Sequence, residues 1–130
     1  MSPGDDAPAS FDLDAAWLRR FQSDVQANLR AFALLLQEAL PDLVTLEERR
    51  GLFERKGTIV GLSVLLGDHR YALHCDRGRL QASIGLIVRG VTLNTKSVEP
   101  AEWFRRLAEE TRKSSEQARS LSRSLSGFMG

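Results

Sequence analysis

The sequence is poor in the residues from which most small reactive sites are built: its 130 residues include one cysteine and two histidines. A lone cysteine, Cys75, excludes an intramolecular disulfide, and its place on the apolar face of a predicted strand favours a small buried hydrophobe over a reactive thiol. His69 and His74 fall on opposite faces of an ideal strand, and no Cys or carboxylate cluster surrounds them at ligand spacing. We therefore expect no metal and no cofactor.

The sequence also lacks a strong charge bias and a long apolar run. Eighteen Lys and Arg against seventeen Asp and Glu give a net charge of +1, far from the basic excess of proteins held mainly by nucleic-acid phosphates. No run reaches the 18 or so apolar residues of a membrane span, and the N-terminus lacks the pattern of a signal peptide. Together with the single cysteine, these features favour a soluble, cytoplasmic protein.

Signatures of catalysis are missing as well. The glycines are spread as turn and bulge residues, so no Walker or dinucleotide-binding loop is present. Glu47-Glu48 and Glu109-Glu110 are paired carboxylates on segments that we expect to face solvent, whereas general acid–base chemistry needs a cleft that perturbs such groups. The turn at Asp76-Arg77-Gly78-Arg79 could bind an anion, but hairpins use Asp and Gly at such positions for backbone reasons alone, and we favour this structural explanation. The sequence predicts a protein that is not an enzyme.

What is present is a β-meander between residues 58 and 95. Apolar and other residues alternate with a period of two, which is typical of strands. The sequence predicts strands over 58–66, 69–75 and 80–86, with a short last strand over 91–93. The tight turns between them are predicted at Gly67-Asp68, Asp76-Arg77-Gly78 and Arg89-Gly90.

Helices are predicted on both sides of the meander. Apolar residues spaced by three and four predict one helix of about 28 residues, from near Phe11 to before Pro41. Residues 43–46 resemble a first strand, and the charged segment up to Gly57 is either a hairpin at a solvated sheet edge, which we favour, or a loop. Pro100 suits the first position of a second helix. We expect these side chains to be buried: Trp17, Phe21, Leu62, Val64, Leu73, Leu86 and Trp103.

The predicted fold class is therefore α+β: a long N-terminal helix, an antiparallel meander of four or five strands, and a long C-terminal helix, with the helices on one face of the sheet. Residues 1–9 have the composition of a disordered tail. We expect a single domain over 10–113 and a C-terminal helical extension over 114–130.

The extension has a heptad seam with weak occupants, because Thr111, Ser114 and Ala118 stand where a self-sufficient coiled coil has Leu or Ile. We expect this segment to project from the domain and to be ordered by a partner, as in helix-in-groove recognition. The predicted partner-binding residues are Leu121, Leu125, Phe128, Met129, Arg112, Arg119 and Arg123.

Three short runs carry a resemblance: residues 76–80 (Asp-Arg-Gly-Arg-Leu), residues 88–93 (Val-Arg-Gly-Val-Thr-Leu), and Pro100 with Glu102-Trp103. They resemble small uncharacterised α+β proteins of high-GC Gram-positive bacteria over about half of the chain. The order of helix, antiparallel strands and helix also looks like the fold of secretion-type chaperones. The resemblance implies a fold and no particular activity.

The function that these features favour is a non-enzymatic protein–protein interaction module, an adaptor or chaperone-like protein that forms a homodimer and binds another cytoplasmic protein. The reason is an excess of apolar helix surface over what one small sheet covers. The alternative is binding to nucleic acid or to an anionic membrane through the Arg/Lys-rich face of the last helix.

Overall fold

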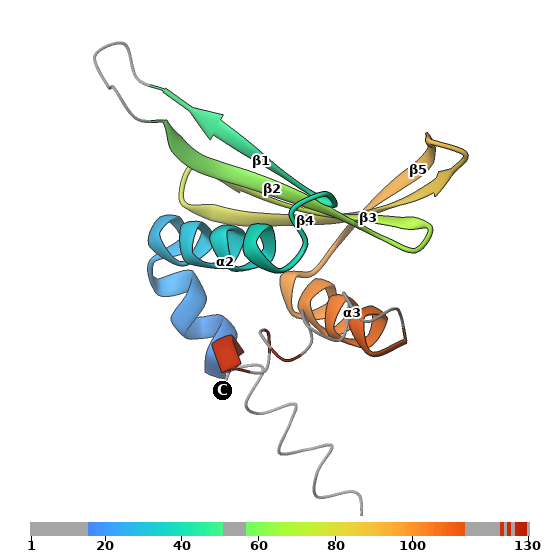
Figure 1. The fold of residues 1–130 in the computed structure, drawn as a ribbon. Coiled ribbons are helices and arrows are strands. Elements are labelled where there is room, and N and C mark those ends of the chain that lie inside the picture. Colours follow the sequence, from blue (N-terminus) through green and yellow to red (C-terminus); the bar gives the residue numbers. More distant parts are fainter. Residues whose placement is uncertain (1–15, 51–56, 114–122, 124, 126, 130) are drawn as a thin grey trace, which may run out of the picture.

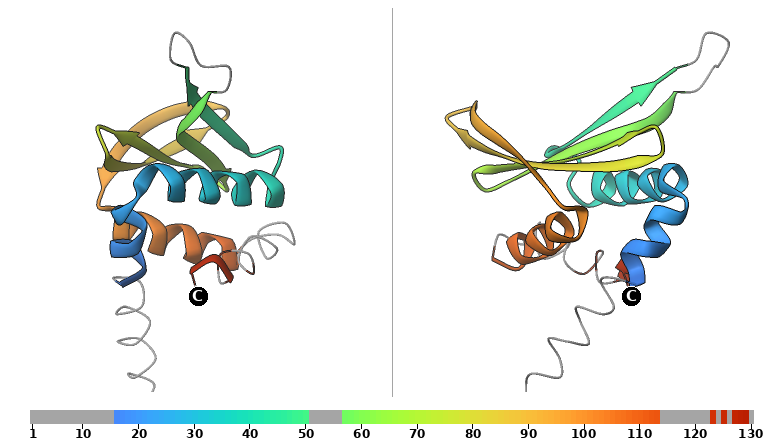
Figure 2. Two further views of the ribbon diagram at one scale, coloured as in Figure 1. Left: turned by 90° about the vertical axis from the view of Figure 1, so that its left-hand side faces the viewer. Right: turned by 180° about the vertical axis from the view of Figure 1, so that it is seen from behind.

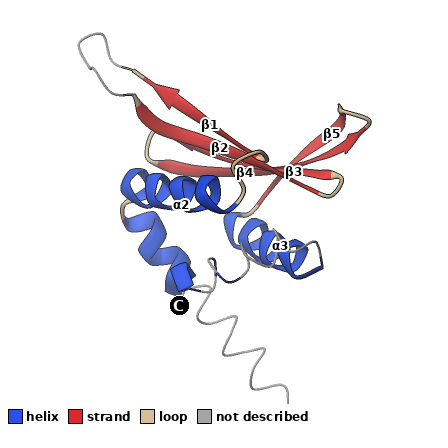
Figure 3. Ribbon diagram, in the orientation of Figure 1, coloured by secondary structure: helices blue, strands red, loops and turns tan. Residues whose placement is uncertain are grey.

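A computed structural model describes residues 16–50, 57–113, 123, 125 and 127–129 of the chain. It shows an α+β fold, which confirms the predicted fold class, with a layer of helices against one antiparallel sheet (Figures 1 and 3). The elements in chain order are a helix over 16–23, α2 (Val25–Ala39), β1 (Val44–Arg49), β2 (Thr58–Leu66), β3 (His69–Asp76), β4 (Arg79–Val88), β5 (Val91–Val98) and α3 (Pro100–Lys113).

The single N-terminal helix predicted from the sequence is wrong, because the chain turns at Asp24 and forms two helices. Asp24 leaves helical geometry with φ −146° and accepts a hydrogen bond from the backbone N–H of Ala27, so it is the N-cap of α2. Asn28 closes the other side of the break, since its side-chain amide donates to the carbonyl oxygens of Arg20 and Phe21. The periodic apolar stripe continues through the turn and conceals it.

The sheet has the order β1-β2-β3-β4-β5, and every neighbouring pair is antiparallel. Two of its hairpins use an Arg-Gly turn, in which Arg77 and Arg89 have φ of 53° and 52° and the following glycines have φ of 76° and 79°. Left-handed geometry at both central residues matches the twist of the flanking strands. These tight turns fix the registers of β3 with β4 and of β4 with β5.

The edges of the sheet differ in length from the predictions. β1 continues through Glu47, Glu48 and Arg49 and pairs with β2, which confirms the hairpin edge over the loop; residues 51–56 lie outside the described residues. The predicted length of the last strand is wrong, because β5 runs to Val98 rather than to Leu93. Polar residues of β5 break the apolar alternation in the sequence. The backbone of β5 nevertheless pairs with that of β4 as far as Ala82, which is opposite Val98.

A bulge in β2 changes which side chains face the core. Glu47 pairs with Gly61 and Glu48 pairs with Ile59, so Val60 has no partner on β1. Such an extra residue reverses the alternation. Ile59 is therefore buried and Val60 is half-buried, whereas a regular strand would place Val60 on the core face together with Leu62.

The core lies between the helices and one face of the sheet (Figure 2). Trp103 is fully buried at its centre, where its indole N–H donates to the carbonyl oxygen of Ser83 at 3.1 Å. The rings of Phe32 and Phe104 lie around it, with centroids 6.1 and 4.9 Å away. Of the side chains predicted to be buried, all are buried except Leu86, which is only partly buried.

Candidate functional site

Strand β5 is the most exposed regular element of the described chain. Its first seven residues are exposed, and only Val98 at its end is partly covered. Val91 and Leu93 are each 59% exposed, and Val88 across the turn is 43% exposed. Figure 1 shows this hairpin extending away from both labelled helices. Because β5 is an edge strand, it presents a row of backbone N–H and C=O groups that have no partner on its outer side.

The opposite edge of the sheet is protected by charge. Three of the six residues of β1 are Glu47, Glu48 and Arg49, all exposed, whereas Lys96 is the only charged residue among the eight of β5. Charged side chains on an edge strand discourage pairing with another chain. A bulge at Leu93, which has no partner on β4, also interrupts β5, but the strand beyond it remains regular. The two edges therefore differ in their capacity to pair with a further strand.

The open face of the sheet carries an imidazole–carboxylate pair. His74 Nδ1 lies 2.6 Å from Glu47 Oε1, with about a third of the histidine side chain exposed. Gly61 lies between them on β2: a Cβ there would stand 2.9 Å from the carboxylate oxygen and 3.0 Å from the carbonyl oxygen of Leu73. In the described part of the chain no hydroxyl or thiol hydrogen-bonds to His74, so this pair has no nucleophile of its own to activate.

The other histidine lies on the helix-facing side, as its spacing from His74 predicts. His69 Nδ1 is 3.6 Å from Glu110 Oε1, and the same oxygen accepts a hydrogen bond of 3.4 Å from the hydroxyl of Tyr71. Burial and the negative charge of Glu110 raise the pKa of Tyr71 to about 12. These contacts join the beginning of β3 to the last turns of α3.

The position of this cluster corrects one expectation from the sequence. Glu109 and Glu110 are partly buried, and Glu110 exposes only 23% of its side chain, so the pair does not simply face solvent. With His69, Tyr71 and Arg106 they line a cavity of about 130 Å³. A cavity of this size holds waters or an ion rather than an organic substrate. We therefore assign the cluster a structural role at the junction of sheet and helix.

One cation of α3, Arg105, is matched by carboxylates on the same helix. Arg105 donates to Glu102 at 2.9 Å and to Glu109 at 3.1 Å, and its hydrogen bond lowers the pKa of Glu102. A cation that is neutralised in this way attracts phosphates weakly. Of the predicted cationic contacts, Arg123 is exposed, while Arg119 and the side chain of Arg112 lie outside the described residues.

Three of the apolar residues predicted to anchor a partner from the C-terminal extension contact the chain's own core instead. Leu125 is 3% exposed, and Phe128 and Met129 are partly buried against the same cluster. The ring of Phe128 lies 5.9 Å from that of Trp17 and 5.6 Å from that of Phe32. Leu121 lies outside the described residues. At the three described positions the chain itself covers the side chains that we expected to be exposed.

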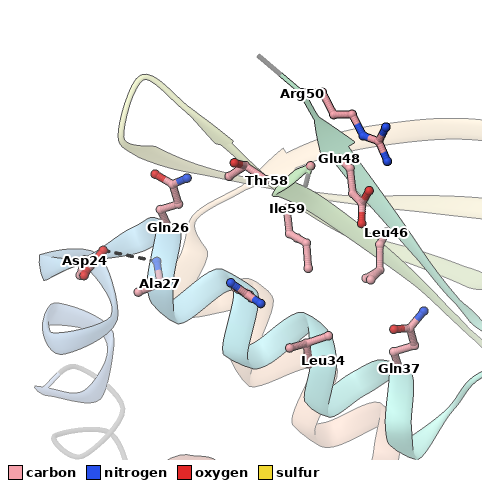
Figure 4. A pocket seen from close by; sticks show the side chains of 12 residues that line it. Asp24, Gln26, Ala27, Leu34, Gln37, Leu46, Glu48, Arg50, Thr58 and Ile59 are labelled. Atoms are coloured by element: carbon pink, nitrogen blue, oxygen red, sulfur yellow. Dashed lines mark hydrogen bonds between the residues drawn. The ribbon is translucent and has the colours of Figure 1, made fainter. Parts of the chain in front are cut away.

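Two pockets large enough for a small molecule lie at the end of the sheet where β1 ends and β2 begins. A groove of about 970 Å³ separates α2 from the ends of β1 and β2 (Figure 4). Its lining mixes charges of both signs, with Asp24 and Glu48 near Arg30 and Arg50. A smaller pocket of about 340 Å³ adjoins it and lies beside the β3–β4 turn. None of the described residues that line it is a carboxylate. The sequence did not reveal either pocket, because residues from three or more elements form each of them.

Two further features of the described chain concern ligands and membranes. Among the described residues, no three or more His, Cys, Asp or Glu side chains come together as a possible metal site. In the same part of the chain, no helix combines the length and the apolar character needed to cross a bilayer. Cys75 is a free thiol and is half-buried rather than fully buried.

Comparison with known proteins returns no significant match: no family model fits the chain, and neither a curated protein nor a solved structure is similar to it.

Proposed function

We propose that this protein is a non-enzymatic protein–protein interaction module that forms a homodimer through strand β5 and serves as an adaptor or chaperone-like partner of another protein. The observation that supports this proposal is the exposure of β5, an edge strand with uncovered Val91 and Leu93 and a single charge. Long uncharged edges are rare in monomers because they pair with other strands.

Pairing two copies along β5 follows from the symmetry of antiparallel strands. A two-fold axis that passes through the sheet sets β5 of one copy beside β5 of the other in antiparallel orientation, and each copy then uses the same surface. The result is a continuous sheet in which the outer N–H and C=O groups of both strands find partners. Lys96 restricts the register, since pairing that places two Lys96 residues opposite each other is unfavourable.

The register that we favour centres the axis on Thr95. Residues directly opposite each other in an antiparallel pair share one face of the sheet, so a two-fold axis through the sheet sets the residue at the axis opposite its own copy. This register places Lys96 opposite Asn94 of the second copy, so the two lysines do not face each other. The pairing region then runs from Thr92 to Val98.

The apolar surface that supports association lies on the sheet rather than on the helices. Of the five large apolar side chains exposed in the described chain, only Leu34 belongs to a helix; the others are Leu65, Val88, Val91 and Leu93. The excess of apolar helix surface expected from the sequence is covered by the chain's own core.

The direct test is sedimentation velocity across the micromolar range of protein concentration. We expect a concentration-dependent species with twice the chain mass. Leu93→Lys should raise the dissociation constant at least about tenfold, because it removes an apolar side chain from the interface and adds two positive charges to the two of Lys96. Leu93→Glu should weaken the dimer less, since its charge is opposite to that of Lys96.

The matched control is Leu34→Lys, which adds the same charge at an exposed leucine of α2. This variant should leave the dimer unchanged. A monomer at every concentration, or equal weakening by Leu34→Lys and Leu93→Lys, contradicts the proposal. Dissociation by salt alone would instead favour electrostatic association, because apolar pairing depends little on ionic strength.

A further inference from the structure

The pocket of about 340 Å³ beside the β3–β4 turn combines three arginines with an apolar wall. Arg49, Arg50 and Arg77 line it, and none of the three forms an ion pair with any described residue. Cations that line one pocket repel one another, and an anion that binds between them relieves the repulsion.

Strand pairing brings these arginines together. Arg49 is opposite Thr58 at the beginning of β2, and Arg50 follows it directly. On the other side of β2, Gly61 is opposite His74 of β3, and β3 leads into the turn that contains Arg77. Neighbouring strands are about 4.8 Å apart, so residues on the two strands that flank β2 are separated by about 10 Å. Long arginine side chains at that separation reach one phosphoryl group between them.

The remaining lining residues complete the chemistry of the pocket. Gln26 at the beginning of α2 and Thr58 supply a side-chain amide and a hydroxyl, and Figure 4 shows both at this end of the sheet. Ile59 and Val60 supply apolar surface. The volume lies within the range of about 300–1,000 Å³ typical of small-molecule sites, so it leaves room for more than a phosphate ion.

We propose that this pocket binds an organic phosphate monoester, with its phosphoryl group between Arg49, Arg50 and Arg77 and its organic part against Ile59 and Val60. Planar guanidinium groups bind phosphate through paired N–H donors, and three of them select a dianion over a singly charged group. The pocket is near β1, at the edge opposite to β5, and does not depend on dimer formation.

Phenyl phosphate, inorganic phosphate and phenol are the probes for calorimetric titration of the full chain. We expect phenyl phosphate to bind more tightly than inorganic phosphate, and phenol not to bind. Arg49→Gln and Arg77→Gln should each weaken phenyl phosphate binding about tenfold or more, the effect of one lost charge-assisted pair. Arg79→Gln is the matched control, because Arg79 is exposed two residues away and does not line the pocket.

Cys75 offers a second readout. It lines the pocket and is the only cysteine, so alkylation with iodoacetamide reports on this place alone. Phenyl phosphate should slow the alkylation in the wild-type protein and in Arg79→Gln, but not in Arg77→Gln. Thermal unfolding without ligand should be unchanged in all three variants, because the substituted side chains are exposed.

Vesicles of phosphatidylcholine with and without phosphatidic acid distinguish a lipid headgroup from a free ester. If the protein sediments with vesicles that contain phosphatidic acid, and this binding is lost in Arg77→Gln and kept in Arg79→Gln, the result supports the same phosphomonoester site with a lipid headgroup as its ligand. The proposal is overturned if phenyl phosphate does not bind at millimolar concentration, if Arg79→Gln weakens binding as much as Arg77→Gln, or if Cys75 is not protected.

Discussion

The side-chain amide of Asn28 donates a hydrogen bond of 3.1 Å to the carbonyl oxygen of Phe21, across the break between the first helix and α2. The same amide also donates to the carbonyl oxygen of Arg20. Helices leave their last carbonyl oxygens without intrahelical partners, and here a residue from the next helix satisfies two of them. Asn28 thus fixes the angle at which the two helices meet.

Substitutions at the break should therefore destabilise the fold by moderate amounts. Asp24→Ala removes the N-cap and should cost about 0.5–2 kcal/mol. Asn28→Ala should cost about 1–3 kcal/mol, because it leaves a partly buried carbonyl oxygen unpaired. Urea unfolding measures both. Gln37→Ala, an exposed change in α2, should stay within about 0.5 kcal/mol; an increase in stability of Asn28→Ala would instead favour one continuous helix.

Trp103 should be the most costly core position to truncate. Trp103→Ala should lower the free energy of unfolding by about 3–5 kcal/mol, because a fully buried ring is lost and a cavity remains. Trp103→Phe keeps most of the ring contacts but leaves the carbonyl oxygen of Ser83 without its donor, so its cost should be smaller. The measurement is chemical denaturation, in which the dependence of the free energy of unfolding on denaturant concentration should be the same as in the wild-type protein. A loss near zero for Trp103→Ala would place this side chain at a surface.

The stability of the protein should fall as the pH rises from about 10 to about 12. In this window the unfolded chain loses the Tyr71 proton first, because the folded chain holds the pKa of Tyr71 near 12 against an ordinary value of 10.0. The unfolded state then binds fewer protons, which lowers the free energy of unfolding. Tyr71 is the only tyrosine, so its absorbance at alkaline pH follows this residue alone.

Two variants test the physical cause of this shift. Glu110→Gln should lower the pKa of Tyr71 without restoring its ordinary value, because burial is the larger cause and the charge of Glu110 the next. Tyr71→Phe should lessen the alkaline loss of stability. If the absorbance of the folded wild-type protein titrates near pH 10, the hydroxyl is not protected in the way that the structure shows.

The meander could be predicted because its signals are local. Alternation with a period of two, interrupted by Arg77-Gly78 and Arg89-Gly90, defines strands and two-residue turns without reference to the rest of the chain. The helix break was missed because Phe21 and Val25 continue the same apolar stripe on both sides of it. Asp24 was the available signal, since Asp is a preferred N-cap, but an N-cap inside a periodic stripe is easily read as a surface residue.

The candidate sites depend on tertiary pairing and were therefore not visible. His74 meets Glu47, which lies 27 positions earlier, only because β1 and β3 both flank β2. Arg49 and Arg77 approach each other for the same reason. The sequence after Leu46 was compatible with either a hairpin or a loop, so it did not reveal that these two residues are near each other. The exposed length of β5 was missed because its polar residues resemble a loop.

Gly61 provides the last prediction, because its missing side chain makes room for the His74–Glu47 pair. A Cβ at this position would lie 2.9 Å from Glu47 Oε1, 3.2 Å from His74 Nδ1 and 3.0 Å from the carbonyl oxygen of Leu73. Gly61→Ala should therefore displace the carboxylate and strain the strand, at a cost of about 1–3 kcal/mol in urea unfolding.

The double variant separates the two causes of that cost. In a Glu47→Ala background the carboxylate contact is gone but the Leu73 carbonyl contact remains, so Gly61→Ala should cost less without becoming neutral. Ser63→Ala, a half-buried change on the same face of β2, should stay within about 0.5 kcal/mol and serves as control. An equal cost of Gly61→Ala in both backgrounds would show that the backbone of β3 alone requires glycine here and that the His74–Glu47 pair does not.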